Sequence, residues 1–317
     1  MKTSNIAFVK NRFMSYVVSG ILVIASFVLL FTKGLNYGID FKGGNIIHVT
    51  FDKVSNETEI REVFKKISET NNLNFAADRI TIQNVSSGIK DREFIIQYPT
   101  TSKDSIEANT INEKIMSGLN TELPYSKDNL EVSYIGPTIG DEMKEKGFIA
   151  ALLSCIGILL YLAYRFDFAS SVGVVLAVGH DLIVSLGFIS LLSIEFDTTV
   201  LVALLTLLGS SVNDSIVIFD RIRENTRISK NGTTFIDIVN SSINQSLSRT
   251  LNTTITTLLA LGALVAYGGD PIYGFSITLT FGCIIGTYSS ICIASTCVLD
   301  IFKKEKAVKK AEEMVAA

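Results

Sequence analysis

The chain has 317 residues, a length typical of two domains. Apolar residues make up 48% of it and charged residues only 19%, with a mean hydropathy of +0.39 and a formal net charge of −3. Residues 33–146 nevertheless hold 14 of the 28 Lys and Arg residues and 18 of the 31 Asp and Glu residues. That segment has the composition of a soluble domain, whereas the rest is too apolar to stay in water. A soluble two-domain enzyme is therefore excluded, and no basic excess supports a nucleic-acid partner.

Several kinds of site are also excluded. The four cysteines lie in apolar runs without a C-x-x-C pair, and the only histidines are His48 and His180. The sequence has no G-x-x-x-x-G-K-[ST] or G-x-G-x-x-G motif. We therefore expect no disulfide, metal centre, nucleotide site, cofactor or enzymatic activity.

The first element is an uncharged run of 19 residues, 14–32, preceded by Lys2, Lys10 and Arg12. It is longer than the apolar region of most signal peptides, and no A-x-A-like cleavage site follows it. Residues 1–34 are predicted to be an N-terminal tail and transmembrane helix 1.

Residues 35–140 have the patterns of a soluble α+β domain. Alternation predicts strands over 46–51, 79–85, 93–98 and 129–135, and helical spacing predicts helices over 57–70 and 105–119. The order βαββαβ predicts a ferredoxin-like domain inserted between two membrane spans.

Glycine-rich joints flank this domain. The entry joint, Y-G-I-D-F-K-G-G, contains Gly38, Asp40, Gly43 and Gly44, and the exit joint I-G-P-T-I-G contains Gly136 and Pro137. Glycines allow tight turns at a membrane exit, so spacing alone assigns these residues a structural role.

Five further apolar runs follow, at 147–164, 169–194, 198–219, 250–267 and 272–299. Each is long enough to cross a hydrocarbon core about 30 Å thick. The prediction is an α-helical polytopic membrane protein with six spans, five of them within 141–302. A basic tail occupies 303–317.

The placement of Lys and Arg predicts the orientation. The N-terminal tail, the turn at Arg165, the 221–249 connection and the C-terminal tail are basic, whereas the intervening short loops carry no Lys or Arg. By the positive-inside rule both termini are cytoplasmic and the soluble domain is outside, which in a bacterium is the periplasm.

The 221–249 connection contains an amphipathic helical pattern that Thr233 or Thr234 could cap. We predict a helix along the cytoplasmic interface, with a helix packed on the bundle as an equal alternative. The apolar positions of this pattern are Phe235, Ile236, Val239, Ile243 and Leu247.

The strongest functional signal is Asp214, six residues before Asp220 and therefore about 9 Å inside the fourth span. A carboxylate at such a depth costs about 2.5–3.5 kcal/mol unless it is paired, hydrated or protonated. Arg249, at a similar depth in the fifth span, is a candidate partner. We predict a switchable Asp214–Arg249 pair for proton coupling over the alternative of a fixed helix–helix hydrogen bond.

Two neighbouring features support or extend this site. Asp181, beside His180 in the third span, is predicted either to join the relay or to be a protonated packing residue. Polar side chains at the start of the fifth span could solvate a proton path or only join helices. Gly282-x-x-x-Gly286 predicts close helix packing. The polar stripe consists of Thr253, Thr254, Thr256 and Thr257.

Taken together, these motifs resemble the SecF branch of the SecD/SecF family of protein-export membrane proteins. The resemblance rests on the two joints, on G-H-D-L in span 3, on S-L-S-R-T-L-N-T-T-I-T-T-L-L in span 5 and on V-N-D-S-I-V-I-F-D-R-I-R-E-N in span 4. The span 4 motif includes Asn213, Asp220 and Arg221. The resemblance covers nearly the whole chain in order.

The resemblance implies a half-transporter of the resistance-nodulation-division superfamily that works with SecD and the SecYEG channel. It implies use of the proton-motive force to promote late steps of preprotein translocation across the bacterial inner membrane, and it assigns the proton-linked positions to Asp214 and Arg249. The further partners that it implies are YajC, a membrane insertase, the unfolded preprotein and membrane lipid.

Two alternatives remain at this point. One is a half-transporter of the same superfamily that exports a small molecule or a lipid. The other is an assembly scaffold in which Asp214 has a structural role only.

Overall fold

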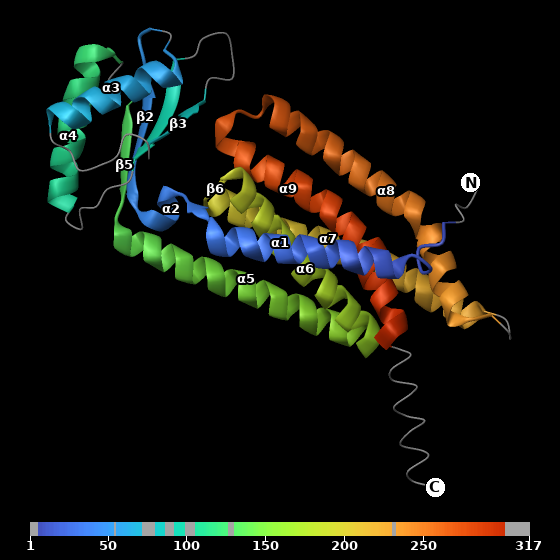
Figure 1. The fold of residues 1–317 in the computed structure, drawn as a ribbon. Helices are drawn as coiled ribbons and strands as arrows, with labels where there is room; N and C mark the ends of the chain where they lie inside the picture. Colours follow the sequence, from blue (N-terminus) through green and yellow to red (C-terminus); the bar gives the residue numbers. More distant parts are fainter. Residues whose placement is uncertain are drawn as a thin grey trace.

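The computed structural model describes residues 6–53, 55–71, 80–85, 92–98, 105–125, 130–229 and 233–301. A small sheet covered by two helices lies at one end of a bundle of long helices (Figure 1). The predicted tail, 303–317, and the first residues of two predicted strands, Arg79 and Asn129, lie outside the described residues.

The four strands of the small domain form one antiparallel sheet in the order β3-β4-β2-β5. Between the strands lie α3, after β2, and α4, after β4, so the element order is the βαββαβ predicted from the sequence. The elements are β2 (Gly44–Thr50), α3 (Glu57–Thr70), β3 (Thr81–Asn84), β4 (Glu93–Tyr98), α4 (Ser105–Glu122) and β5 (Glu131–Ile135).

Period-2 and period-3.6 patterns explain how this domain buries its core. Ile47 and Val49 of β2 and Ile96 of β4 point to one face of the sheet, where Ile60 and Phe64 of α3 cover them. The domain therefore has a hydrophobic core of its own, separate from the core of the bundle.

The six predicted spans are confirmed within the described part of the chain as six helices long and apolar enough to cross a membrane. The central helices α6, α7 and α9 are largely buried, whereas α1, α5 and α8 are mostly exposed. A π-helical turn, Ser290–Ala294, follows α9, and the helical run continues to Ile301. The helices are α1 (Arg12–Thr32), α5 (Pro137–Arg165), α6 (Phe168–Leu192), α7 (Thr198–Ile228), α8 (Phe235–Tyr267) and α9 (Asp270–Ser289).

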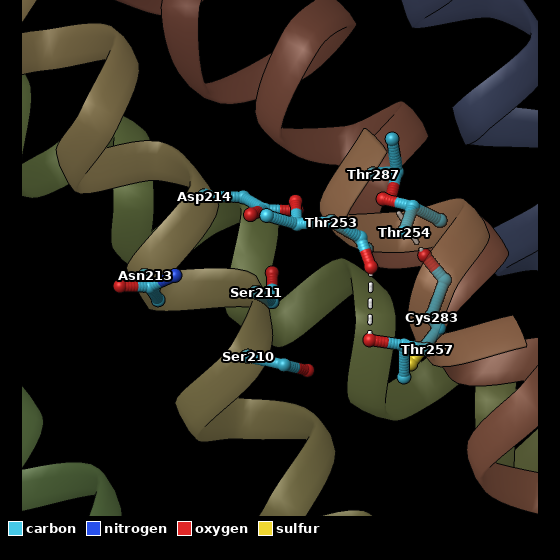
Figure 2. A pocket seen from close by; sticks show the side chains of 10 residues that line it. Ser210, Ser211, Asn213, Asp214, Thr253, Thr254, Thr257, Cys283 and Thr287 are labelled. Carbon is cyan, nitrogen blue, oxygen red and sulfur yellow. Dashed lines mark hydrogen bonds between the residues drawn. The ribbon is translucent and has the colours of Figure 1, made fainter. Parts of the chain in front are cut away.

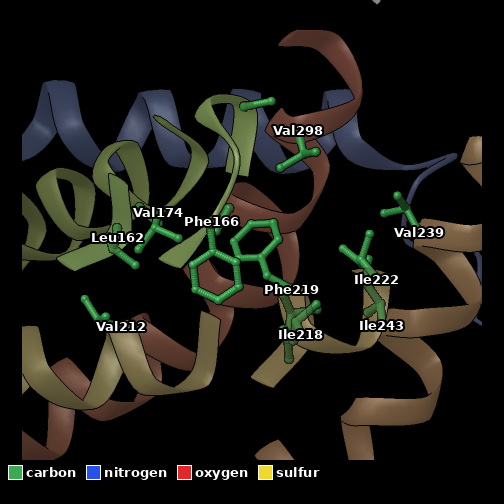
Figure 3. Close-up of a cluster of buried hydrophobic side chains, with 14 of the residues drawn as sticks. Leu162, Phe166, Val174, Val212, Ile218, Phe219, Ile222, Val239, Ile243 and Val298 are labelled. Carbon is green, nitrogen blue, oxygen red and sulfur yellow. The ribbon is translucent and has the colours of Figure 1, made fainter. Parts of the chain in front are cut away.

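The larger hydrophobic core of the bundle includes the end of α5 that lies away from the sheet. Figure 3 shows side chains of this core from close by. Phe166, which follows α5, packs against Phe219 of α7 with ring centroids 6.1 Å apart. Ile222 of α7 and Ile243 of α8 continue this cluster. The core holds the ends of α5, α7 and α8 together.

The amphipathic helix predicted within 221–249 is present, and it is the first part of a longer helix. Helix α7 continues to Ile228, and α8 runs without a break from Phe235 through residue 249 to Tyr267. Val239 and Ile243 are buried in the bundle core, and residues 233–261 contain no Gly or Pro that would end the helix. Tertiary packing therefore favours the alternative, a helix packed on the bundle, and Thr234 caps it by accepting from the Asp237 N–H.

A small junction joins the sheet domain to the bundle. Strands β1 (Asn36–Tyr37) and β6 (Glu195–Phe196) pair in parallel, and the short helix α2 (Ile39–Lys42) follows β1. Because β6 lies between α6 and α7, this pairing fixes the entry to the sheet domain directly over the start of α7.

Candidate functional site

A polar pocket lies between α7, α8 and α9 (Figure 2). Its volume, about 110 Å³, is enough for several water molecules. Asp214 is the only residue in its lining that carries a formal charge. The lining consists of Ser210, Ser211, Asn213, Asp214, Thr253, Thr254, Thr257, Cys283, Gly286 and Thr287.

Asp214 is half-buried and points from α7 across the pocket towards the threonines of α8 (Figure 2). Within the described ranges its carboxyl group makes no hydrogen bond or ion pair. A carboxyl group therefore faces a polar space inside a predicted span, and its role in proton coupling stays a prediction. A group in this position can exchange partners or a proton without breaking an existing contact.

The predicted pairing of Asp214 with Arg249 is absent from this structure. Arg249 is exposed on α8, does not line the pocket and forms no ion pair with any described residue. Residue 249 lies four positions before Thr253, one helical turn from the pocket lining. The sequence therefore located the two groups near one site, while their contact requires a movement of α8 or of the arginine side chain.

Asp181 has a different environment from Asp214. It is 0% exposed, and its Oδ2 accepts hydrogen bonds from Ser211 Oγ at 2.6 Å and Ser289 Oγ at 2.7 Å. Its Oδ1 lies 3.1 Å from His180 Nδ1. These contacts match the sequence-based alternative of a packing residue bonded to serines and fix the carboxyl group between α6, α7 and α9.

The two carboxyl groups are nevertheless linked through shared neighbours. Ser211 lines the pocket of Asp214 and also donates to Asp181. Gly286 lines the same pocket, and a Cβ at that position would lie 3.6 Å from Asp181 Oδ2. Asp181 therefore lies directly behind the pocket wall that Ser211 and Gly286 form.

Three of the four threonines in the predicted stripe line the pocket, and Thr256 does not. Thr254 and Thr287 share a hydrogen bond of 2.8 Å between α8 and α9. Thr257 donates to its own helix, to the Thr253 carbonyl at 2.9 Å. The threonine stripe therefore fits both predicted roles, because it joins helices and also presents hydroxyl groups to the pocket.

Small residues bring α7 and α9 close together around this site. A Cβ at Gly282 would lie 2.7 Å from Leu207, and a Cβ at Gly286 would lie 3.3 Å from Ser211. This confirms that Gly282-x-x-x-Gly286 is a close-packing motif.

Sequence reasoning missed the serines of α9 and the π-helical turn that follows it. Ser290 donates to the Ser211 carbonyl at 3.1 Å, and Ser295 donates to the Ser290 carbonyl at 2.6 Å. The extra residue of a π turn disrupts the regular ladder, and such turns are frequent at functional sites. The adjacent serines at 289 and 290 within an apolar run were the available signal.

The residues of the entry joint link the sheet domain to α7. Asp40 Oδ2 accepts from the Thr198 N–H at 3.0 Å, and the Gly38 N–H donates to the Phe196 carbonyl at 2.9 Å. Gly43 has φ +77°, which favours glycine, and Gly44 begins β2. Asp40 is thus a cap for a helix far away in the sequence, which spacing alone did not reveal.

The remaining predicted motif residues lie at the start of α5 and within α7. Gly136 and Pro137 occupy the N-cap and first position of α5. Asp220 forms an ion pair with Arg165 at 3.1 Å, and Arg221 Nε donates to Gln245 Oε1 at 2.6 Å. The contacts of Asp220 and Arg221 hold α5, α7 and α8 together. Asn213, in contrast, lines the pocket of Asp214.

A second contact between the sheet domain and the bundle was not predicted. The Asn84 N–H at the end of β3 donates to Asp270 Oδ2 at the start of α9, at 3.0 Å. Nearby, burial raises the pKa of Glu195 in β6 above its ordinary value, and a hydrogen bond with Thr81 of β3 opposes that rise. Edge strand β3 therefore lies against the ends of the bundle helices.

The site contains hydroxyl and carboxyl groups but no set of side chains suited to a metal. Across the described residues there is no group of three or more His, Cys, Asp or Glu that could hold a metal ion. The fold and the site together define a polytopic membrane protein with carboxyl groups buried between its helices and a soluble α+β domain at one end.

Comparisons with known proteins identify a family within this class of membrane proteins. The sequence model described as "Protein export membrane protein SecD/SecF, C-terminal" matches residues 115–304, and the "SecD/SecF GG Motif" matches residues 28–53, which include Gly43 and Gly44. The chain is 40% identical over 294 residues to the protein translocase subunit SecF of Calditerrivibrio nitroreducens, covering 92% of each chain. It is 39% identical over 303 residues to the SecF of Vibrio alginolyticus, covering 95% of this chain and 89% of that one.

Two solved structures share the architecture. The crystal structure of SecDF, a translocon-associated membrane protein from Thermus thermophilus, superposes with a TM-score of 0.77 at 32% identity. A structure of SecDF in a super-membrane-facing form gives 0.71, also at 32% identity. This chain is covered to 95% and 98%, but it spans only 39% and 40% of those longer chains. The chain belongs to the SecD/SecF family of protein export membrane proteins.

Proposed function

We propose that this chain is the SecF-type accessory subunit of a bacterial Sec translocase and that it couples the proton-motive force to late steps of preprotein translocation and release. The observation that carries the coupling is Asp214, a half-buried carboxyl group that has no partner among the described residues and faces a polar pocket inside the helical bundle. The relatives of nearly equal length are named protein translocase subunit SecF. The role is transport, without a catalytic step of its own.

The topology follows from the charge pattern and the position of the sheet domain. The beginning of α1 and the end of the α9 helical run lie together at the end of the bundle away from the sheet, where Arg12 and Asp300 pair at 3.3 Å (Figure 1). With the basic loops inside, both termini are in the cytoplasm, and the sheet domain is in the periplasm of an inner-membrane protein. The βαββαβ order and the antiparallel β3-β4-β2-β5 sheet support a ferredoxin-like fold for it.

The partners are proposed from the comparison with SecDF. Since this chain matches about two fifths of the SecDF chains, we propose that a SecD-type subunit corresponds to the remainder and that the pair acts with the SecYEG channel. YajC and a membrane insertase are further candidate partners, membrane lipid surrounds the spans, and the unfolded preprotein is the substrate. Nucleic acid and cofactors have no role in this proposal, because the proton gradient supplies the energy.

In the proposed mechanism Asp214 alternates between the unpaired state of this structure and a state in which it is paired with Arg249. Protonation of Asp214 weakens its attraction to a cation, and deprotonation favours approach of Arg249 from one helical turn away. Alternation between these states shifts α8 against α7 and moves the periplasmic domain. One charge crossing 100 mV supplies about 2.3 kcal/mol, enough to bias a two-state element by nearly two decades. Asp181, behind Ser211, is a secondary candidate for the same relay.

The test is Asp214→Asn in proteoliposomes that contain SecYEG and the SecD-type partner. We expect the variant to assemble normally but to lose the stimulation of export by a proton gradient, because an amide cannot release a proton. The matched control is Asp237→Asn on α8, which makes the same chemical change at an exposed carboxyl group. Full gradient-dependent export by Asp214→Asn would contradict proton coupling and favour the scaffold alternative.

One observation keeps export of a small molecule or a lipid as the second candidate. An apolar cavity of about 510 Å³ lies between α5 and α7 near the junction, with Phe41, Phe148 and Phe196 in its lining. That function predicts an assembly independent of SecYEG. Copurification of the chain with a SecD-type subunit and SecYEG from native membranes separates the two, since an exporter half would be recovered without the channel.

A further inference from the structure

A second polar pocket lies at the end of the bundle away from the sheet, where α5 and α7 end. Its volume is about 350 Å³, and it is separate from the pocket of Asp214. It is rich in arginine, and only one residue of its lining is apolar. The lining consists of Arg165, Asp220, Arg223, Glu224, Arg227 and Ile228.

Both carboxylates of this pocket are already paired. Asp220 Oδ1 lies 3.1 Å from Arg165, whose guanidinium is also stacked 5.3 Å above the ring of Phe166. Glu224 Oε2 accepts from Arg221 at 2.6 Å, and Arg221 does not line the pocket. The negative charges are therefore compensated by arginines that have fixed positions.

Two guanidinium groups remain available. Arg223 and Arg227 are exposed and form no ion pair or hydrogen bond with any residue in the described ranges. They are four residues apart on α7, so their side chains lie on the same face of the helix. Together with Arg165 they give the pocket a net positive charge, and a planar guanidinium suits the paired oxygens of a phosphate group.

The surroundings of the pocket indicate the surface of a lipid bilayer. Tyr164 is 92% exposed, Phe168 72% and Ile228 71%. Tyr164 and Ile228 lie at the ends of α5 and α7, which line the pocket, and Phe168 begins α6 three residues after Arg165. Exposed aromatic side chains next to arginines at a span end are typical of the membrane–water interface. A ligand here can therefore place a phosphate among the arginines and hydrocarbon against the adjoining apolar side chains.

We infer that this pocket binds the phosphodiester headgroup of an anionic phospholipid. Basic pockets between transmembrane helices at this depth bind such headgroups, and each basic residue contributes separately to the attraction. A free phosphate ion would use the same guanidinium groups, but it would gain nothing from the exposed aromatic and aliphatic side chains.

The experiment measures bound lipid on the full chain purified in detergent and supplied with an equal mixture of phosphatidylglycerol and phosphatidylcholine. Native mass spectrometry then gives the ratio of the two bound lipids. We expect enrichment of phosphatidylglycerol, with about a fivefold fall in the ratio for Arg223→Gln and again for Arg227→Gln. The matched control is Lys10→Gln, which removes one exposed positive charge at the same end of the bundle but outside the pocket.

Two further comparisons complete the test. Arg227→Lys keeps the charge but loses the planar fork, so its ratio should lie between those of the wild type and Arg227→Gln. Excess inorganic phosphate should leave most of the bound phosphatidylglycerol in place. Unchanged thermal unfolding of each variant shows that the pocket alone was altered.

Three results would overturn the assignment. The first is no preference for phosphatidylglycerol in the wild type. The second is an equal loss in Lys10→Gln, which would mean a diffuse surface charge effect. The third is complete displacement by inorganic phosphate, which would identify the pocket as a site for free phosphate.

Discussion

Asp181 and Asp214 are two aspartates in neighbouring helices with opposite surroundings. Asp181 is fully buried and accepts short hydrogen bonds from two serines, whereas Asp214 is half-buried and has no partner within the described residues. A carboxyl group with fixed donors contributes to packing, and one without them is available for exchange. The pocket thus combines a fixed wall with one adaptable acidic group.

This contrast predicts different effects of the same substitution at the two positions. Asp181→Ala leaves the Ser211 hydroxyl group without an acceptor and removes the shorter of the two hydrogen bonds of Ser289, which also donates to the Gly286 carbonyl at 3.1 Å. We therefore expect a loss of about 2 kcal/mol in the free energy of unfolding. Asp214→Ala removes no existing hydrogen bond and should change stability much less. Thermal unfolding of both variants in the same detergent measures the difference, and equal losses would show that the hydrogen bonds of Asp181 contribute nothing to stability.

At the scale of elements, close approach between helices depends on particular small residues. A Cβ at Gly187 of α6 would lie 2.4 Å from Ser26 Cβ and 2.7 Å from Ser26 Cα of α1. Backbone cannot move aside as a flexible side chain can, so any larger residue at 187 forces the two helices apart. Gly179, two turns earlier on α6, has no atom within 4 Å of the equivalent position.

The pair Gly187→Ala and Gly179→Ala tests this packing on one helix. Gly187→Ala should destabilise the protein by about 1–3 kcal/mol, the usual cost of overpacking. Gly179→Ala should be neutral or stabilising, because alanine favours the helix by about 1 kcal/mol over glycine. Denaturation in mixed detergent micelles gives both values. A loss of stability in Gly179→Ala as large as that in Gly187→Ala would contradict the steric explanation.

At the scale of the whole molecule, the sheet domain contacts two of the three helices that line the acidic pocket, α7 and α9. Asp40 caps α7, and Asp270 at the start of α9 accepts from Asn84 of β3. Helices α7 and α9 also supply Asp214 and Gly286 to the pocket. A shift of either helix along its axis would therefore move its contact with the sheet domain.

Substitution of two aspartates that cap α7 can distinguish coupling between the sheet domain and the bundle from simple helix capping. Asp40→Ala and Asp197→Ala each remove one acceptor from the first turn of α7, at a cost of about 1 kcal/mol. Only Asp40→Ala also removes a contact between the sheet domain and the bundle. We expect faster hydrogen exchange over residues 36–44 in Asp40→Ala but not in Asp197→Ala, measured by mass spectrometry. Identical exchange in both variants would mean that Asp40 is a cap and nothing more.

Much of this architecture could be predicted from residue patterns. Apolar runs long enough to cross a membrane predicted the six spans. The alternation around Ile47 and the helical spacing around Phe64 predicted the order of strands and helices. These features depend on periodicity and composition, which neighbouring residues carry by themselves. The cost of burying a charge likewise singled out Asp214 before any contact was known.

Contacts between distant segments could not be predicted in the same way. The cap that Asp40 provides for Thr198 joins residues 158 positions apart, and the serine donors to Asp181 come from two other helices. A helix beginning at Phe235 was predicted, but its continuity with the fifth span was missed, because burial of Val239 and Ile243 depends on α7 being alongside.

The sequence by itself thus determined the membrane class, the inserted α+β segment and the acidic residue of interest. Hydrophobic burial and the cost of an intramembrane charge are properties of the chain that hold in any arrangement of the helices. The tertiary structure decided which groups meet, with Asp181 fixed by serines, Asp214 facing an open pocket and Arg249 one turn away. Hydrogen bonds act only over about 3 Å, so pairing depends on the packing of helices and not on their sequences alone.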